Sequence, residues 1–241
     1  MIDLHCHLLP GVDDGAKTLD EGLAMARLAV ADGIRLACLT PHLHSERPTV
    51  SRTALLAATQ QFQRALDQQG IPLAVRSGCE ALFSIELLDA IALDEILFLG
   101  TVDGYRILLL EFPHQTIPVG ADRLVNKLFS LKIRPLIAHP ERNQAVMAQP
   151  EKIHPFVAQG CWLQLTAGSL AGRFGERSRE IALGMVENEW ATVIASDAHD
   201  AIDRPPVLSE GVAVLRQRFG DEVARSLAMT NPARIVEGEG A

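Results

Sequence analysis

The sequence contains nine imidazole and carboxylate side chains of the types that bind transition metals. Five are histidines and four are acids, a mixture that suits manganese, iron, cobalt or zinc better than calcium or magnesium. Nine ligands are too many for one ion, because a zinc ion takes only three or four from a protein. We therefore expect a cluster of two or three divalent ions, held by His5, His7, Asp14, His42, Glu80, Glu111, His139, Asp197 and His199.

Two pairs among these residues have a spacing that favours joint binding of one ion. His5 and His7 follow an apolar run, and residues i and i+2 lie on the same side of a strand. Asp197 and His199 repeat this spacing near the other end of the chain. A closed barrel would place the second pair beside the first.

The charge balance favours an anionic substrate held by metal ions. The net charge of −8 leaves no basic surface for nucleic acid, which disfavours a nuclease. The four acids among the nine residues carry −4, and three divalent ions would carry +6, which leaves +2. A dianionic phosphate ester fits that excess, whereas the metal-free site would repel it.

Short apolar runs alternate with longer amphipathic stretches, which predicts βα units and a parallel sheet. Most of the nine residues come directly after a run, and the carboxyl ends of barrel strands share one face, where active sites form. The runs number one fewer than the eight strands of the common α/β barrel. We expect a seven-stranded α/β barrel whose strands lie at residues 1–4, 36–40, 73–77, 107–110, 135–138, 162–165 and 192–195.

Helix-like segments separate these runs. Thr18 with Glu21 three residues later forms a capping-box pattern.

The sixth apolar run, residues 162–165, contains Gln164 and offers no strong metal ligand. The glycine-rich residues 168–175 lack the P-loop pattern and are expected to form a flexible loop over the site. The predicted helices span residues 18–31, 51–69, 121–131, 151–159, 177–189 and 209–219.

The composition is that of an ordinary globular protein. A chain of 241 residues with 48% hydrophobic content can form one domain over residues 1–241 with a large core. The N-terminus does not resemble a secretory leader, and no apolar run reaches the roughly 18 residues of a membrane span. The four cysteines lack CxxC spacing, so we expect buried, reduced thiols in a cytoplasmic protein without membrane insertion.

A cysteine-nucleophile phosphatase is excluded by the residues that follow the cysteines. Such an enzyme needs the Cys-x5-Arg loop, with an arginine six positions after the cysteine. In this chain those positions hold Val12, His44, Ile85 and Ala167.

Several short motifs together resemble the PHP (polymerase and histidinol phosphatase) superfamily. The match extends over essentially the whole chain, and the motif order and length are most similar to its bacterial tyrosine-protein phosphatase branch, the capsular polysaccharide phosphatases. The motifs are His5-Cys6-His7, Val12-Asp13-Asp14-Gly15-Ala16, Thr40-Pro41-His42, Gly78-Cys79-Glu80, His139-Pro140-Glu141-Arg142, Ser196-Asp197-Ala198-His199 and Asn231-Pro232-Ala233-Arg234-Ile235.

The resemblance implies a distorted (βα)7 barrel with three divalent metal ions, typically Mn²⁺, with Fe, Co or Zn as alternatives. It implies a phosphotyrosine protein as substrate, typically a membrane-associated tyrosine autokinase that controls capsule or exopolysaccharide export. It also implies ligands for each ion: His5, His7, Glu80 and Asp197 for one, Glu80, Glu111 and His139 for a second, and Asp14, His42 and His199 for a third. The sequence leaves open whether Asp13 or Asp14 is the ligand.

Two arginines near the predicted ligands are candidates for binding phosphate. Arg142 follows His139, Arg204 follows His199, and a guanidinium binds phosphate oxygens with two hydrogen bonds. Metal-activated water would attack the phosphorus, and the phenolate would leave. Two alternatives stay open: a small-molecule phosphatase such as a histidinol phosphatase, and a non-catalytic PHP regulatory protein, which we disfavour because all nine residues are present.

Overall fold

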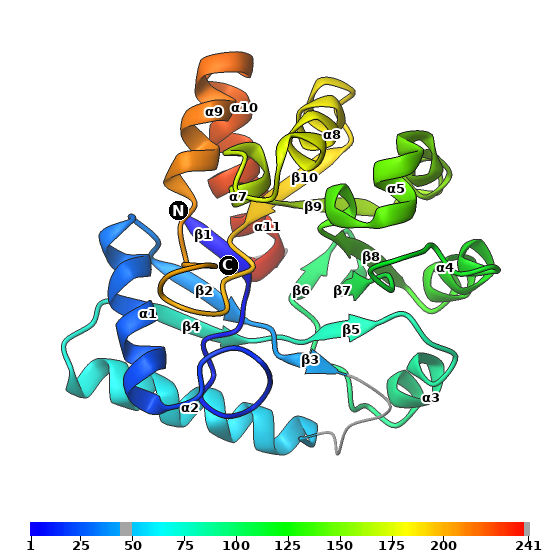
Figure 1. The fold of residues 1–241 in the computed structure, drawn as a ribbon. Coiled ribbons are helices and arrows are strands. Elements are labelled where there is room, and N and C mark those ends of the chain that lie inside the picture. Colours follow the sequence, from blue (N-terminus) through cyan, green and yellow to red (C-terminus); the bar gives the residue numbers. More distant parts are fainter. Residues whose placement is uncertain (44–49, 239–241) are drawn as a thin grey trace.

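The computed structural model describes residues 1–43 and 50–238 and shows an α/β fold in which mainly parallel strands alternate with helices (Figure 1). All seven predicted strands are present. The strands are β1 (Ile2–Cys6), β2 (Leu36–Leu39), β3 (His42–Leu43), β4 (Ala74–Ser77), β5 (Glu80–Leu82), β6 (Gly100–Val102), β7 (Tyr105–Glu111), β8 (Ile133–Ala138), β9 (Trp162–Thr166) and β10 (Ala191–Ala195).

The helices surround the strands, and the predicted cap is present: the Thr18 side chain accepts a hydrogen bond from the Glu21 amide. No helix in the described part of the chain is long and apolar enough to cross a membrane. The helices are α1 (Leu19–Ala31), α2 (Arg52–Gln68), α3 (Leu87–Ala92), α4 (Ala121–Ser130), η1 (Pro140–Arg142), α5 (Gln144–Ala148), η2 (Pro150–Ile153), α6 (His154–Ala158), α7 (Ala167–Leu170), α8 (Glu176–Glu187), α9 (Ser209–Phe219), α10 (Asp221–Arg225), η3 (Ser226–Thr230) and α11 (Asn231–Glu237).

Two predicted segments differ in the structure. The helix expected over residues 151–159 is divided into η2 and α6, because Pro155 has no N–H to continue the hydrogen-bond ladder. Residues 168–175 were expected to form a loop, but they begin inside α7, which packs against α8 and α9. The expectation of a flexible loop is therefore wrong for the first part of this segment.

The strands form two sheets instead of the single closed sheet that a regular barrel would have. One sheet has the order β1-β2-β4, and the other has the order β10-β9-β8-β7-β5-β3 with β6 antiparallel on β7. The sheets separate where β2 leads into β3 at Thr40-Pro41 and β4 leads into β5 at Gly78-Cys79. Backbone hydrogen bonds of 2.9 Å from Gly78 to Leu39 and 3.1 Å from Glu80 to Pro41 continue the pairing across this break.

The first and last strands lie side by side, as predicted. The Asp197 amide donates to the His5 carbonyl and the His7 amide donates to the Ala198 carbonyl, both at 2.8 Å. Cys6 and Ala198 form an isolated parallel bridge. These contacts join β1 to the segment that follows β10, although the strands of the described residues do not form one closed sheet.

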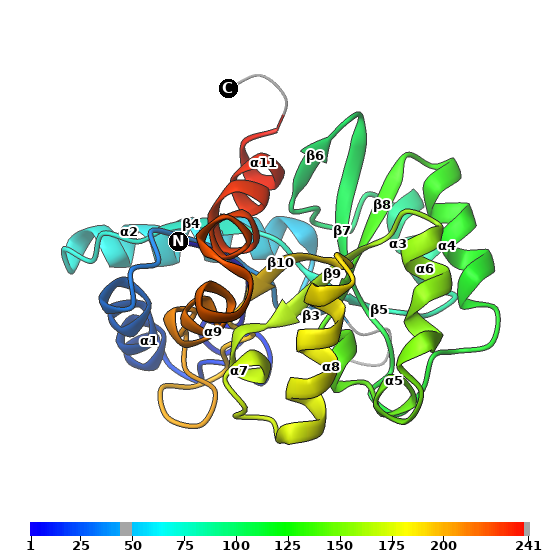
Figure 2. The same ribbon diagram turned by 90° about the horizontal axis from the view of Figure 1, so that it is seen from above.

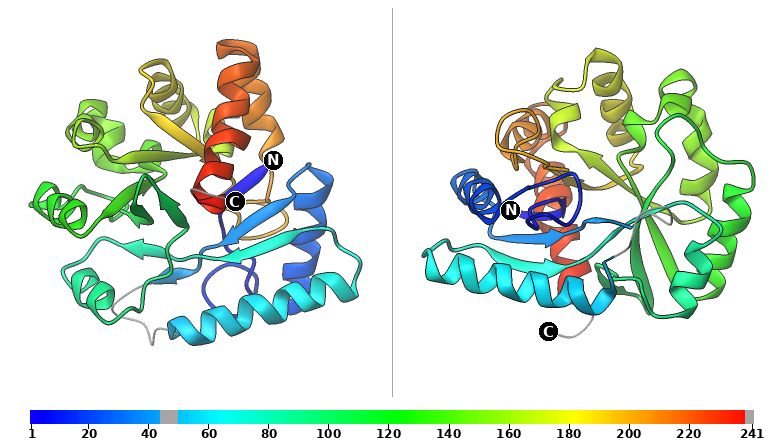
Figure 3. Two further views of the ribbon diagram at one scale, coloured as in Figure 1. Left: turned by 180° about the vertical axis from the view of Figure 1, so that it is seen from behind. Right: turned by 60° about the horizontal axis from the view of Figure 1, so that its bottom comes forward.

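The apolar core has an outer part under the helices and a smaller inner part between the strands. The inner part includes Leu4, Leu109 and Leu136, together with Ile235 and Val236 of α11. Helix α11 lies beside β6 (Figure 2) and crosses the face of the sheets seen from behind (Figure 3, left). It thereby covers the inner core at the end of the strands opposite the predicted site.

Candidate metal centre

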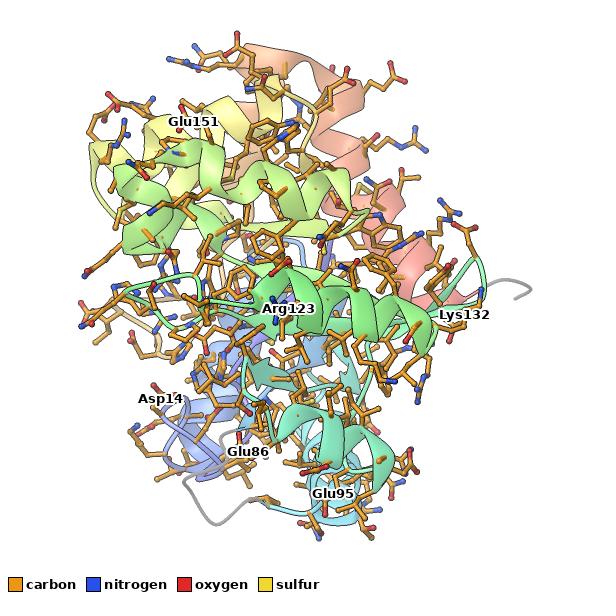
Figure 4. The ribbon with its side chains drawn as sticks, turned by 90° about the vertical axis from the view of Figure 1, so that its right-hand side faces the viewer. Asp14, Glu86, Glu95, Arg123, Lys132 and Glu151 are labelled. Atoms are coloured by element: carbon orange, nitrogen blue, oxygen red, sulfur yellow. The ribbon has the colours of Figure 1, made fainter. Side chains whose placement is uncertain are left out.

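The structure brings all nine predicted residues together at the carboxyl ends of the strands. Asp14 lies with Glu86 on one side of the molecule, whereas Lys132, just before β8, lies on the other (Figure 4). The residues form four overlapping groups whose nitrogen and oxygen atoms lie within 4.8 Å of one another: His7 with Asp14, His42 and His199; His5 with His7 and Glu80; His5 with His139 and Asp197; and His42 with Glu80 and Glu111.

Glu80 lies at the centre of this cluster. Its Oε2 atom is 3.1 Å from His5 Nε2 and 2.9 Å from His42 Nδ1, and its Oε1 atom is 3.0 Å from His139 Nε2. Glu80 is fully buried as the first residue of β5. One carboxylate that faces three imidazoles from three strands is suited to bridge two cations.

Two acceptors outside the nine residues fix the orientation of the first two imidazoles. His5 Nδ1 lies 2.9 Å from Gln164 Oε1, and His7 Nδ1 lies 2.6 Å from Asp13 Oδ2. The Gln164 oxygen also accepts from the His139 amide at 3.4 Å, which identifies it as the oxygen of the side-chain amide. With hydrogen on both Nδ1 atoms, the two Nε2 lone pairs face each other at 3.1 Å, as metal-binding imidazoles do.

Asp13 and Asp14 have different surroundings, which distinguishes their roles. Asp13 is almost buried and accepts from His7, from the Gly15 amide and from the His42 amide. The Asp14 side chain is 54% exposed, and its Oδ1 lies 3.4 Å from His42 Nε2. Asp13 therefore orients other groups, whereas Asp14 is free to offer an oxygen to a cation.

The residues present fit a group of divalent cations. Glu80 Oε2 and Asp197 Oδ1 are buried in the centre of the cluster and accept no hydrogen bond from the described residues. Buried acceptors in proteins are nearly always satisfied, so two such oxygens beside converging imidazole nitrogens indicate a missing positive partner. The donor set of imidazoles and carboxylates suits manganese, iron, cobalt or zinc.

The charges of the cluster are strongly coupled in the metal-free protein. Burial alone would raise the pKa of Glu80, but the His5 charge, the His139 hydrogen bond and the close imidazoles of His42 and His5 hold that pKa well below its usual range. For Glu111, burial and the negative charge of Glu80 raise the pKa. Burial would also lower the pKa of His7, yet its hydrogen bond to Asp13 and its contacts with Asp197 and Glu80 raise that pKa well above normal, so protons compete with cations for this site.

Both candidate phosphate-binding arginines contact Asp197 at the edge of the cluster. Arg142 and Arg204 donate to Asp197 Oδ2, the latter at 2.6 Å, while Oδ1 faces the imidazoles. Asp197 and His139 have left-handed backbones, with φ of 52° and 30°, and such strain in non-glycine residues gathers at functional sites. The Arg142 guanidinium also stacks on the Phe174 ring at 4.2 Å.

The sequence analysis missed two residues that hold the site together. Gln164 is fully buried on β9, the strand for which no ligand was expected, and its signal was a polar side chain within an apolar run. Asp3 accepts from the Ser196 amide at 3.0 Å and from its hydroxyl at 2.5 Å, which ties β1 to the segment after β10. An acid inside the first apolar run was the corresponding signal.

Comparison with known proteins identifies the family. Residues 1–237 match the model of the family described as capsular polysaccharide synthesis, CpsB/CapC. The chain belongs to the CpsB/CapC family. Among its CpsB/CapC relatives, the tyrosine-protein phosphatase YwqE of Bacillus subtilis is 36% identical over 92% of this chain and 87% of its own length. The tyrosine-protein phosphatase CpsB of Streptococcus agalactiae is 26% identical over 98% of both chains.

A solved CpsB/CapC structure has the same fold. The chain superposes on one from the crystal structures of YwqE from Bacillus subtilis and CpsB from Streptococcus pneumoniae with a TM-score of 0.93. The identity is 33%, and the match covers 100% of this chain and 96% of the other. Those two proteins are described as unique metal-dependent tyrosine phosphatases.

Proposed function

We propose that this protein is a metal-dependent tyrosine-protein phosphatase of capsule or exopolysaccharide synthesis, with the whole chain as one phosphatase domain. The observation that carries the proposal is the convergence of nine imidazole and carboxylate side chains, with two arginines at their edge, in a chain whose relatives are tyrosine-protein phosphatases. The buried cysteines agree with the exclusion of a cysteine nucleophile.

The proposed cofactor is a group of three divalent ions, with Mn²⁺ as the first candidate. When bound, the ions would supply positive charge for phosphate oxygens and activate water near neutral pH. The proposed fold is a distorted seven-stranded barrel around this group. The ligand assignment taken from the family resemblance is supported by the mutual distances: His5, His7, Glu80 and Asp197; Glu80, Glu111 and His139; and Asp14, His42 and His199.

The two arginines are proposed to bind and orient the phosphate. Arg142 and Arg204 each donate through one terminal nitrogen to Asp197, which leaves further N–H groups on each guanidinium. Their shared contact with Asp197 holds them next to the cluster. The face of the Phe174 ring packs against the Arg142 guanidinium and helps to hold it in place. Phosphoryl transfer depends mainly on such positioning and on charge stabilisation.

The proposed substrate is a phosphotyrosine protein, with a membrane-associated tyrosine autokinase as the candidate partner. Four free, buried cysteines accord with a reducing compartment, so we place the enzyme in the cytoplasm. A phenolate is a fairly good leaving group, so the proposal requires no dedicated general acid.

The test compares hydrolysis of a phosphotyrosine peptide, the matching phosphoserine peptide and histidinol phosphate by the manganese-loaded protein. We expect the phosphotyrosine peptide to be hydrolysed fastest, and we expect Arg142→Lys and Arg204→Lys to lower that rate because lysine cannot bind two oxygens in a planar fork. An exposed arginine, replaced in Arg218→Lys, serves as the control. Preference for histidinol phosphate would replace the proposal with a small-molecule phosphatase.

A further inference from the structure

A second group of arginines lines a cavity that contains none of the nine residues of the metal centre. The cavity has a volume of about 450 Å³ and lies between α2, β4, β6 and α11. Arg52, Arg76 and Arg106 contribute to its wall, beside the apolar side chains of Leu56 and Val236. Helix α11 lies on the face seen from behind in Figure 3, away from the carboxyl ends of the strands.

These arginines have few partners among the described residues. Arg52 Nε is buried without a hydrogen-bond partner among the described residues, and its NH1 atom is 3.5 Å from the exposed Asp94 carboxylate. The Arg106 guanidinium stacks on the Phe98 ring at 4.3 Å, which leaves its N–H edge available. The exposed Arg76 lines the same cavity and makes no hydrogen bond or ion pair with the residues that the structure describes.

Several other arginines of this acidic chain are paired with acids. Arg173 donates twice to Glu210, and Arg216 donates to Asp221. By contrast, Arg52, Arg76 and Arg106 line one cavity, and within the described ranges their single acidic contact is long and exposed and therefore contributes little. Neighbouring like charges repel one another, and a bound anion would offset that repulsion.

We propose that this cavity, the Arg52–Arg76–Arg106 pocket, binds a small anionic molecule that carries phosphate or carboxylate groups. Guanidiniums bind such groups through two parallel hydrogen bonds, and a buried, unpaired Nε donor gains most from an acceptor. The apolar wall formed by Leu56 and Val236 would contact the body of the ligand. The proposal concerns a site separate from the metal centre and does not depend on the phosphatase activity.

Equilibrium dialysis of the metal-loaded, full-length protein with inorganic pyrophosphate or succinate tests this proposal. Pyrophosphate also has affinity for divalent metals, so the measurement compares the wild type with an Arg76→Gln/Arg106→Gln double variant. The matched control is Arg123→Gln/Arg218→Gln, which removes two exposed arginines elsewhere. Circular dichroism melting of each variant shows whether it is folded.

We expect at least one of the two probes to distinguish the proteins. The wild type and the control should bind one more equivalent of that probe than the Arg76→Gln/Arg106→Gln variant does, or should bind the probe at least tenfold more tightly. Pyrophosphate binding would assign the pocket to phosphate groups, and succinate binding would assign it to carboxylates. Equal binding of both probes by all three proteins would overturn the proposal. So would the lack of saturable binding of either probe at the pocket in the folded wild type.

Discussion

The Nδ1 atoms of His5 and His7 form hydrogen bonds with other side chains of the protein, which leaves the Nε2 atom of each ring to bind a cation. Gln164 accepts from His5 and Asp13 accepts from His7, so both Nε2 atoms turn toward Glu80 and Asp197. Outer partners of this kind fix the tautomer and the ring orientation of a metal-binding histidine. Metal affinity therefore depends on outer residues such as Gln164 and Asp13 in addition to the nine predicted ligands.

The first prediction concerns Gln164. Replacing it in Gln164→Leu removes the acceptor for His5 Nδ1 and should weaken manganese affinity and hydrolysis by about 10- to 100-fold, the usual effect of losing an outer partner. Gln164→Glu keeps an acceptor and should retain more of both. The exposed Gln61→Leu serves as control, and the comparison uses a manganese titration of activity. Equal losses in Gln164→Leu and Gln164→Glu would contradict the role given to the oxygen.

The second prediction separates the two adjacent aspartates. Asp13→Asn places an amide donor among groups that already donate, so the free energy of unfolding of the metal-free protein should fall by about 1–3 kcal/mol. Asp14→Asn should change it by less than about 0.5 kcal/mol, because the side chain is half exposed. Both should lower hydrolysis. Urea unfolding provides the measurement, and a larger loss of stability in Asp14→Asn would reverse the two assignments.

The third prediction concerns the thiols. Burial raises the pKa of Cys38, Cys79 and Cys161 to about 12, and burial likewise raises the pKa of Cys6 well above normal. The neutral thiol is unreactive, so iodoacetamide at pH 8 should leave the folded protein unmodified and active. After unfolding, mass spectrometry should detect four modifications. Modification of any thiol in the folded protein would contradict the burial and the raised pKa of these side chains.

At the scale of elements, the break in the sheets positions two residues of the site. Pro41 has no N–H and precedes His42, while Gly78 and Cys79 precede Glu80, so both strands resume with a site residue as their first member. The sequence predicted β2 and β4 but not the short continuations β3 and β5. Two or three residues carry too little periodicity for that prediction, and the pairing of β3 with β5 and of β5 with β7 determines the conformation.

Helix α11 covers the end of the inner core and packs closely against β6. A Cβ on Gly100 would lie 1.7 Å from the Ile235 carbonyl oxygen, so Gly100→Ala should force α11 off β6 and cost more than about 2 kcal/mol of unfolding free energy. Gly184→Ala, inside α8 with nothing within 4 Å, should be neutral or stabilise by up to about 1 kcal/mol. Equal urea midpoints for the two variants would contradict this packing.

For the whole molecule, the sequence predicted the positions of seven strands and the convergence of the nine residues, because polar residues directly after buried strands mark the carboxyl face of a parallel sheet. It could not separate Asp13 from Asp14, since a turn brings either one to the site. It also missed Gln164, whose role depends on a contact with His5 from the opposite end of the chain. Such contacts depend on three-dimensional packing and leave no local pattern.

The central claim is that the nine residues bind divalent ions and that these ions are required for hydrolysis of phosphotyrosine. The most direct test removes metal with a chelator, desalts the protein and titrates Mn²⁺ while following hydrolysis of a phosphotyrosine peptide, beside Glu80→Gln and His139→Ala. The account predicts no activity without metal, recovery to a plateau as about three equivalents bind, and little recovery in either variant. Full activity in protein shown by elemental analysis to be free of metal would contradict it.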